Sequence, residues 1–465
     1  MADVRNDFSK GSIPKAILSL ALPMTAAQLV NILYSLVDRI YLGRLPGTGH
    51  LALTGLGITI PIISILNAFA NLCGMGGAPL CSIHRGKGEK EEAERVMGNS
   101  FALLILLGAV TMAICFLLKR PMLYLFGASD VTYPYADEYL TIYLCGTLFV
   151  MIGLGMNPFI NSQGFGRTGM LTVVLGAVVN PVLDPIFIFV LDMGVRGAAL
   201  ATVIAQGCSA VWVMKFLTGR KAILRLKWGN LRLRASRVRR IIALGLAGFF
   251  MSLTNSLVQV VCNITLQHFG GDLYVGIMTI INSLREVFFM GIQGLNNGAQ
   301  PVIGFNYGAE KFSRVRQCIR FSSGVTLGYA ALVWAVVMAL PGPLIRLFND
   351  DAATVTYGIF PMRMYFCLFI FMSLQIAAQS IFVGLGKSKQ AVFFSLLRKA
   401  VINAPLTVIF PIIGMGTSGV FVAEAVSQLI GGLASYVTMY VSVYRPLRGR
   451  VDGSGPAAYP ADRTP

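Results

Sequence analysis

The stretch FALLILLGAVTMAICFLL, residues 101–118, contains eighteen consecutive residues without a charge. A helix of about this length spans the roughly 30 Å hydrocarbon core of a bilayer. The whole chain has the same character, since 55% of its 465 residues are hydrophobic, 12% are charged and its mean hydropathy is +0.70. A water-soluble fold cannot bury that much apolar surface, so the sequence predicts an all-α polytopic membrane protein.

Apolar runs of this kind recur along the chain and are separated by short polar or Gly/Pro-rich breaks. Their length and hydropathy predict twelve transmembrane helices in the cell (inner or plasma) membrane. The expected bounds are 13–41, 52–82, 95–118, 134–161, 168–191, 195–217, 241–268, 273–305, 316–341, 355–384, 390–413 and 416–443.

The formal net charge of +18 is unevenly distributed. If the N-terminus lies inside, 28 Lys and Arg residues fall in cytoplasmic segments and 5 in the opposite loops. This is the positive-inside pattern, with both termini cytoplasmic. The basic run 218–240 is then a cytoplasmic linker near membrane lipids, and nucleic-acid binding is not expected because Trp228 is its only aromatic residue.

Residues that would mark a metal or cofactor site do not cluster. The eight cysteines have no C-x-x-C spacing and nearly all lie in apolar runs, and the three histidines are far apart in the sequence. Gly164, Gly166 and Gly169 form G-x-G-x-x-G, but this motif binds dinucleotides only after a β-strand and here it joins two membrane helices. We therefore expect no enzymatic activity and no cofactor.

The two halves of the chain match at an offset of 222 residues. Helix-breaking and aromatic residues recur in pairs: Pro79 with Pro301, Gly86 with Gly308, Tyr143 with Tyr365, and Gly194 with Gly416. This indicates an internal duplication. Because each copy has an even number of helices, both enter the membrane in the same direction, as two pseudo-symmetric six-helix bundles in a parallel repeat.

The predicted organisation is an N-terminal lobe 1–217, a linker 218–240, a C-terminal lobe 241–444 and a cytoplasmic tail 445–465. In such repeats substrate binds between the lobes, and rocking of the two bundles gives alternating access. This favours a transporter over a channel or a structural protein.

Ionisable residues inside membrane spans cost at least about 2.5 kcal/mol at the helix centre, so each marks a candidate site. The first half contains Asp38 and Asp184, with Asn180 one turn before Asp184 on the same helix face. Helix lengths place both acids and Thr202 in the outer half of the first lobe. We predict that Asp38, Asn180, Asp184 and Thr202 form a cation or proton site.

An alternative interpretation assigns these acids structural roles. Asp38 would pair with Arg39 at the membrane rim, and Asp184 would cap a helix break at Pro181 and Pro185. Pro23 removes a hydrogen bond inside the first helix and predicts a helix bend there, which is either a moving part or a static kink.

The second half carries polar stripes along its first two helices. At spacings of four or seven residues these are Asn255, Gln259, Asn263, Asn282, Glu286, Gln293 and Asn297. They face either water and the substrate or neighbouring helices of the bundle. The offset also places Glu424 on Thr202 and, with one extra residue, Asn403 on Asn180, which predicts a degenerate second site neutralised by Arg398.

Four segments of the chain resemble the multidrug and toxic compound extrusion (MATE) transporters. They are GGAPLCSIHRGKGEKEEAERV (76–96), NPVLDPIFIF (180–189), GAQPVIGFNYGAEKFSRVRQ (298–317) and GLGKSKQAVFFSLLRKAVINAPL (384–406). The resemblance covers nearly the whole chain. It implies export of amphipathic or cationic small molecules by antiport with Na⁺ or H⁺.

The resemblance also implies residue roles. Asp38, Asn180, Asp184 and Thr202 match the first-lobe cation site of the DinF-like branch of this family. By the same similarity Asn31, Tyr34, Tyr139 and Asn157 line the substrate cavity, together with Gln259, Asn282 and Glu286 from the polar stripes. We expect a monomeric protein.

A flippase for a lipid-linked precursor is the alternative function. It would need several cationic residues in the cavity to hold a diphosphate, and only Arg285, Arg363, Arg398 and Lys399 qualify.

Overall fold

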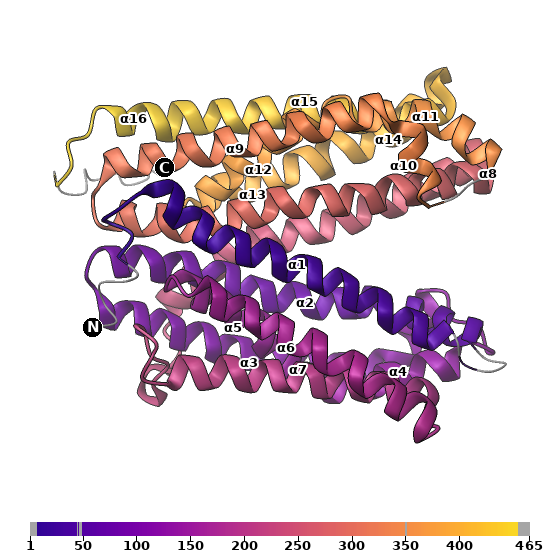
Figure 1. The fold of residues 1–465 in the computed structure, drawn as a ribbon, viewed down its shortest axis with the longest axis horizontal. Coiled ribbons are helices and arrows are strands. Elements are labelled where there is room, and N and C mark those ends of the chain that lie inside the picture. The colour runs from indigo at the N-terminus through magenta and orange to yellow at the C-terminus, as the bar shows by residue number, and fades with distance from the viewer. Residues whose placement is uncertain (1–6, 44, 46–48, 349–350, 454–465) are drawn as a thin grey trace. The chain divides into compact units, whose positions relative to one another are not determined.

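The computed structural model describes residues 7–43, 45, 49–348 and 351–453, and all regular structure in these residues is helical. The α-helices are α1 (Ile13–Gly43), α2 (Gly49–Gly86), α3 (Lys90–Leu125), α4 (Tyr133–Cys145), α5 (Thr147–Ser162), α6 (Gly166–Pro185), α7 (Gly194–Thr218), α8 (Ala235–Gly308), α9 (Phe312–Ala339), α10 (Pro341–Arg346), α11 (Ala352–Phe366), α12 (Phe369–Gly384), α13 (Ser388–Leu396), α14 (Ala404–Phe410), α15 (Gly416–Met439) and α16 (Arg445–Arg448). A 3₁₀ turn, η2 (Trp228–Asn230), and four π-helical segments, η1 (Ile186–Val190), η3 (Leu397–Asn403), η4 (Pro411–Met415) and η5 (Tyr440–Tyr444), complete the set (Figure 1).

Twelve spans result from these elements in the described part of the chain. Nine helical runs are long and apolar enough to cross a membrane alone, with α8 counted as two because its backbone breaks at Gly271. Two more spans are bent pairs, α4 with α5 at 59° and α11 with α12 at 41°. The last run divides in two at Gly414 and Gly416, whose φ angles of 105° and 54° leave the helical region. The predicted twelve-helix membrane fold is confirmed.

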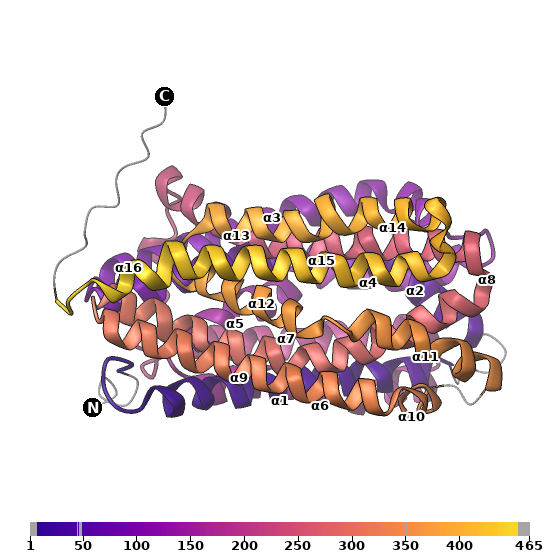
Figure 2. The same cartoon turned by 90° about the horizontal axis from the view of Figure 1, so that it is seen from above.

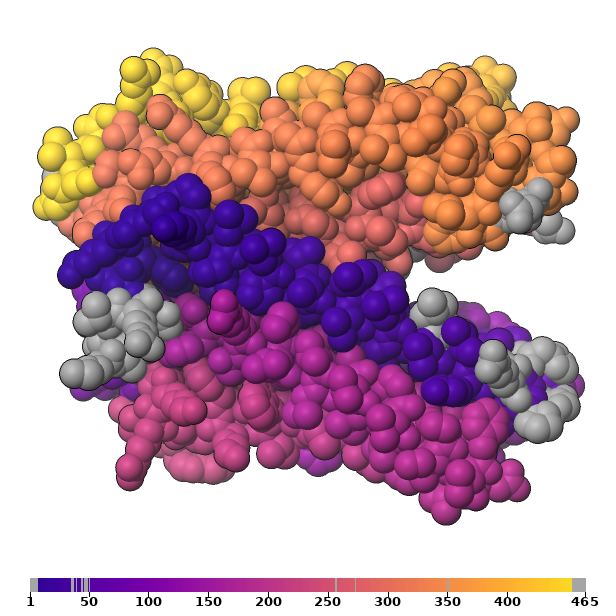
Figure 3. Space-filling model, in the orientation of Figure 1, coloured from indigo at the N-terminus to yellow at the C-terminus, as the bar shows by residue number. Residues whose placement is uncertain are grey.

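Large apolar side chains face outward along these helices. Leu117, Ile264, Leu332 and Ile412 are between 63% and 82% exposed although none is near a polar loop. A soluble protein rarely exposes apolar surface on this scale, whereas lipid requires it. Figure 3 shows one face of the molecule in space-filling form, with α1 in indigo.

The duplication is visible in the backbone at the offset of 222. The hinge between α4 and α5 at Gly146 corresponds to Leu368 between α11 and α12, and α6 and α7 begin where α13 and α15 begin in the second copy. Gly164 and Gly386 both have positive φ, 90° and 72°, in the turns before α6 and α13. A side chain with a Cβ rarely adopts that conformation, so the repeated glycine preserves a repeated turn.

The described residues form two compact units. The first contains Leu22–Cys81 and Glu89–Phe249, and the second contains Phe8–Ala21, Ser82–Gly88 and the chain from Phe250 onward. α1 therefore contributes to both units, with the division just before Pro23. The sequence-based bounds of the lobes, linker and tail divide the chain by the order of its spans and not by contacts, and they stay predictions.

Each unit packs its long helices side by side. In the first, α5 and α6 contact α7, and α3 contacts α4 and α5; in the second, α12 lies between α9 and α15, and α14 packs along α15 (Figures 1 and 2). Aromatic rings join these helices, as where Phe366 lies 5.4 Å from Phe369 and 6.0 Å from Phe288. Such packing supports polar groups placed on the inward helix faces.

The basic linker is held against the start of α3. Arg237 donates two hydrogen bonds of 2.7 Å to Glu92, and Lys227 forms a 2.6 Å ion pair with the buried Glu94. The Asn99 side chain donates to the carbonyls of Asn230 and Arg232. Three charged or polar groups of α3 thus fix the path of the linker.

α2 and the first part of α8 approach closely within the first unit. A Cβ added at Gly245 would collide with the backbone carbonyl of Leu72, and one at Gly76 with that of Ile241. Backbone atoms cannot move aside as a flexible side chain can, so glycine is required for this contact.

We predict that Gly245→Ala destabilises the protein by about 1–3 kcal/mol, the usual cost of overpacking. Gly57→Ala is the matched control, because Gly57 is also helical and a Cβ there meets nothing within 4 Å. The midpoint of thermal unfolding in detergent measures the difference. Equal midpoints for the two variants would contradict the prediction.

Candidate functional site

Three helices of the first unit supply the four residues of the predicted cation site. α1 contributes Asp38, α6 contributes Asn180 and Asp184, and α7 contributes Thr202. All four side chains are buried, with Asn180 and Asp184 completely inaccessible to solvent. Burial of two carboxylates in one region of a membrane helix bundle is costly and marks the region as functional.

The α6 pair forms the interaction that the sequence spacing predicts. Asn180 Nδ2 donates a 2.7 Å hydrogen bond to Asp184 Oδ2 across one helical turn. Pro181 and Pro185 lack N–H groups, so the carbonyls of Ala177 and Pro181 lose their normal helical donors beside this pair. The helix then continues as the π-helical segment η1 rather than ending at Asp184.

Aromatic residues join the acids to the neighbouring helices. Tyr34 of α1 interacts electrostatically with Asp38 and Asp184, and its hydroxyl lies close to Thr202. Tyr139 of α4 lies close to Asp38 and Thr202 and stacks on Tyr143 with ring centroids 6.2 Å apart. The structure therefore brings both predicted tyrosines into the same cluster as the cation-site residues.

The donor set of this cluster suits a hard cation or a proton. Two buried oxygens, Asn180 Oδ1 and Asp184 Oδ1, accept no hydrogen bond among the described residues. Buried polar atoms in native structures normally have partners, so unsatisfied oxygens point to a ligand. Carboxylate, amide and hydroxyl oxygens are ligands for Na⁺, and a carboxylate pair can instead hold a proton.

The remaining first-lobe predictions lie elsewhere. Asn157 donates a 2.9 Å hydrogen bond to the Gly169 carbonyl and accepts one from Asn161, so it links α5 to the start of α6 about three turns before Asn180. Asn31 lies on an exposed face of α1. The alternative pairing of Asp38 with Arg39 involves a side chain outside the described residues.

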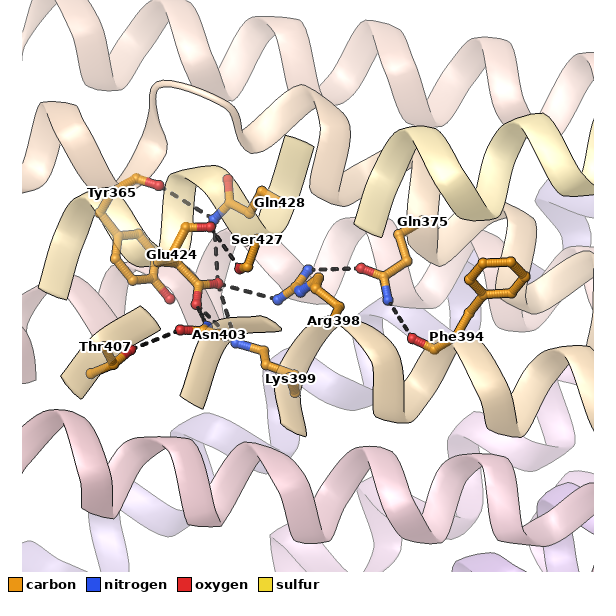
Figure 4. Close-up of polar contacts among 10 residues, drawn as sticks. All are labelled: Tyr365, Gln375, Phe394, Arg398, Lys399, Asn403, Thr407, Glu424, Ser427 and Gln428. Carbon is orange, nitrogen blue, oxygen red and sulfur yellow. Dashed lines mark hydrogen bonds and ion pairs between the residues drawn. The ribbon is translucent and has the colours of Figure 1, made fainter. Parts of the chain in front are cut away.

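A second polar cluster surrounds Glu424 of α15 in the second unit (Figure 4). Its carboxylate accepts hydrogen bonds from Arg398 Nη2 at 3.2 Å and from Lys399 Nζ at 3.1 and 3.2 Å. Asn403 Nδ2 and Gln428 Nε2 also donate to it. The structure thus unites Glu424 with Asn403 and Arg398, as the sequence suggested, and adds Lys399.

The π-helical segment η3 explains how three of these donors reach one carboxylate. Arg398, Lys399 and Asn403 all belong to η3. Adjacent residues of an α-helix point about 100° apart, whereas the wider i→i+5 turn of a π-helix brings residues four and five apart to one face. Segments of this type occur frequently at functional sites.

The two clusters are related by the duplication with their chemical groups exchanged. At the offset of 223, Asn403 and Thr407 occupy the places of Asn180 and Asp184, and Thr407 Oγ1 donates to Asn403 Oδ1 at 3.0 Å across the same helical turn. At the offset of 222, Glu424 occupies the place of Thr202. The acidic residue of the cluster is therefore Asp184 on α6 in the first copy and Glu424 on α15 in the second.

A pocket lies beside the second cluster, within the second unit. Its empty volume is about 570 Å³, and its lining includes Asn255, Arg285, Glu286, Arg398 and Lys399. Glu286 therefore lines a pocket, and its place in a substrate cavity stays a prediction. Gln259 does not line the pocket and donates instead to Asn263 at 3.2 Å, and Asn282 lies one turn before Glu286 with its buried amide unbonded among the described residues.

Comparison with known proteins decides the family. The MatE family model matches residues 23–186 and 248–409, one segment in each half of the chain. The chain belongs to the MatE family. The multidrug export protein MepA of Staphylococcus saprophyticus is 24% identical over 439 residues, covering 93% of this chain and 95% of that protein. MepA of Staphylococcus aureus is 23% identical over 441 residues, with the same coverage.

Solved MATE structures share the fold. A MATE in the bent conformation has a TM-score of 0.88 at 22% identity and covers 94% of this chain and 97% of its own. An outward-facing multidrug resistance MATE transporter has a TM-score of 0.87 at 21% identity, with 96% and 99% covered. The family match and the relatives, which are export proteins rather than enzymes, agree with the sequence prediction of a membrane transporter.

Sequence reasoning missed part of the second-lobe site of this MatE protein. Lys399 was considered only as a cavity cation, and Gln375, which accepts a 3.1 Å hydrogen bond from Arg398 Nη1, was not assigned to the cluster. Two adjacent cations in the middle of an apolar run were the available signal. Arg363, grouped with them in the sequence, is exposed and does not line the pocket.

We predict that Glu424→Gln destabilises the protein by about 3–5 kcal/mol, because it leaves two buried cations without their carboxylate. In Lys399→Gln/Glu424→Gln one cation is removed together with the acid, so the double variant should recover part of the loss. Thermal unfolding in detergent measures both. If the double variant were no more stable than Glu424→Gln, the charge balance would not be the cause.

Proposed function

We propose that the protein is a secondary active multidrug efflux transporter that exports amphipathic or cationic small molecules by antiport with Na⁺ or H⁺. The buried cluster of Asp38, Asn180, Asp184 and Thr202 is the observation that carries this proposal. A purely structural carboxylate would be satisfied by protein donors, whereas Asp184 Oδ1 accepts none among the described residues. The curated relatives, named multidrug export proteins, support export of small molecules.

The acids couple ion movement to transport through differential affinity. An ion can shift the equilibrium between outward- and inward-open states only if it binds one state more tightly. Asp38 reaches the cluster from α1, and Asp184 reaches it from α6. Relative movement of the two helices would change the separation of the carboxylates, and with it the affinity for Na⁺ or a proton.

The available driving force is sufficient for drug accumulation. One monovalent ion moving inward gains about 2.3 kcal/mol per 100 mV of membrane potential, and a tenfold concentration gradient adds about 1.4 kcal/mol. Together these support a gradient of roughly 500-fold for a neutral cargo. A monovalent cationic cargo cancels the electrical part, so the concentration gradient alone then drives exchange with one ion.

Pro23 is the element that we assign to the conformational change. It leaves the carbonyl of Ser19 without its helical donor although α1 continues through it. Residues up to Ala21 belong to the second compact unit, while Leu22 onward belong to the first. A weakened turn at the point where a helix passes from one unit to the other is suited to act as a hinge.

We further propose that the protein acts as a monomer in the cell membrane with both termini in the cytoplasm. The excess of basic residues in the segments assigned to the inside supports this orientation. Surrounding lipids contact the exposed apolar helix faces.

Dye efflux from cells, with Na⁺ and pH gradients imposed separately, tests the coupling. We expect Asp38→Asn and Asp184→Asn each to lower ion-driven accumulation at least about tenfold, because each removes a charge that the ion must meet. The gradient that drives wild-type efflux identifies the ion.

Asp137→Asn is the control, since Asp137 is a first-lobe carboxylate that forms a 2.8 Å ion pair with Lys119 away from the cluster. It should transport nearly as well as the wild type. Full uphill transport by a variant lacking both Asp38 and Asp184 would refute the proposed coupling site.

A further inference from the structure

The pocket of the second unit carries more positive than negative charge. Arg285, Arg398 and Lys399 line it, and Glu286 is its only carboxylate among the described residues. Glu424 lies behind Arg398 and Lys399 and offsets one of the three cations. Even with both acids ionised, the cations outnumber the carboxylates.

This charge lies deep within the membrane-spanning segments. Arg398 is ten residues from the start of α13, and Glu424 is eight residues from the start of α15. At about 1.5 Å per residue, these positions are roughly 15 and 12 Å from the helix ends, near the middle of a 30 Å core. An uncompensated cation at that depth is costly, so a binding partner of negative charge is favoured.

Arg398 retains a donor for such a partner. Its Nη1 donates to Gln375 Oε1 and its Nη2 to Glu424 Oε1, but the buried Nε has no hydrogen-bond partner among the described residues. The side chain is only 5% exposed. A buried guanidinium N–H without a partner is rare and indicates a ligand, and guanidinium groups favour carboxylate, sulfonate and phosphate oxygens.

The rest of the lining suits an apolar body attached to that anionic group. Met251, Phe289 and Met372 form part of the wall. Methionine side chains are flexible and polarizable, which allows one pocket to accept ligands of several shapes. The neighbouring Gln379 and Ser395 are hydrogen-bonded to each other and hold the cationic helix in place.

We propose that this pocket binds the anionic group of an amphipathic molecule, a carboxylate, sulfonate or phosphate. The transporter would then carry anionic or zwitterionic cargo in addition to cations. Transport of this molecule depends on the proposed efflux function, whereas its binding to the pocket does not. An anionic cargo also leaves a cell of negative internal potential with the electrical gradient, at about 2.3 kcal/mol per charge per 100 mV.

Isothermal titration calorimetry on the purified protein tests binding without any ion gradient. The probes are 2-naphthalenesulfonate and the trimethylammonium compound with the same naphthalene body. We expect the sulfonate to bind at least about tenfold more tightly to the pocket, since a charge-assisted hydrogen bond contributes on that scale. Equal affinities, or tighter binding of the ammonium compound, would overturn the proposal.

Variants locate the site. Arg398→Gln should weaken sulfonate binding at least about tenfold. If this single variant does not fold, the double variant Arg398→Gln/Glu424→Gln replaces it, because it removes one cation together with one acid. The double variant should weaken binding by a similar factor. Arg363→Gln is the control, because Arg363 is an exposed membrane arginine outside the pocket. If the Arg398 variants bound the sulfonate as Arg363→Gln does, the pocket would not be the site.

Competition separates two sources of the anion. Displacement of the sulfonate by phosphatidylglycerol, but not by phosphatidylcholine, would support the site with a lipid headgroup as occupant. Displacement by neither lipid would support it with a soluble amphiphile as occupant. The competition experiment is informative only if sulfonate binding depends on Arg398. A loss of ion-driven efflux in a separate assay would contradict the proposed transport function and not the proposed binding site.

Discussion

A carboxylate within a membrane bundle is stable only if protein groups replace the water it has lost. Removing such a group from water costs several kilocalories per mole even after the protein relaxes. Each repeat of this chain holds such a carboxylate, and the number of donors differs sharply between them. Glu424 accepts from Arg398, Lys399, Asn403 and Gln428, whereas Asp184 receives one amide proton from Asn180.

This difference in donors distinguishes a carboxylate held by protein cations from a carboxylate that is available to a mobile ion. The Glu424 cluster is a salt-bridge network whose acid already has more partners than a mobile ion would supply. Asp184 lies near a second acid, Asp38, and two oxygens of the cluster, Asn180 Oδ1 and Asp184 Oδ1, have no hydrogen-bond partner in the part of the chain that the structure describes. This contrast supports the proposals that ion coupling belongs to the first lobe and recognition of charged cargo to the second.

The sequence predicted the fold well because its strongest signals are local. Apolar length gives the spans, and the offset of 222 gives the repeat down to the turns at Gly164 and Gly386. The i, i+4 spacing likewise predicted the contact between Asn180 and Asp184. Lys399 could not be assigned to Glu424 in the same way, because an α-helical projection directs it away from Arg398, whereas in the π-helical segment η3 both side chains reach the same acid.

The π-helical segment η3 also records how the second copy diverged. Helices α6 and α13 begin 222 residues apart, yet Asn180 and Asn403 are 223 apart, so the second copy has one residue more than the first in this interval. A π turn accommodates one residue more than an α turn, and η3 lies within that interval. A single-codon insertion would thus have been absorbed as a local bulge instead of rotating the remainder of the span toward lipid. The bulge leaves two neighbouring cations, Arg398 and Lys399, inside the bundle, so the two copies differ in local charge although their backbones match.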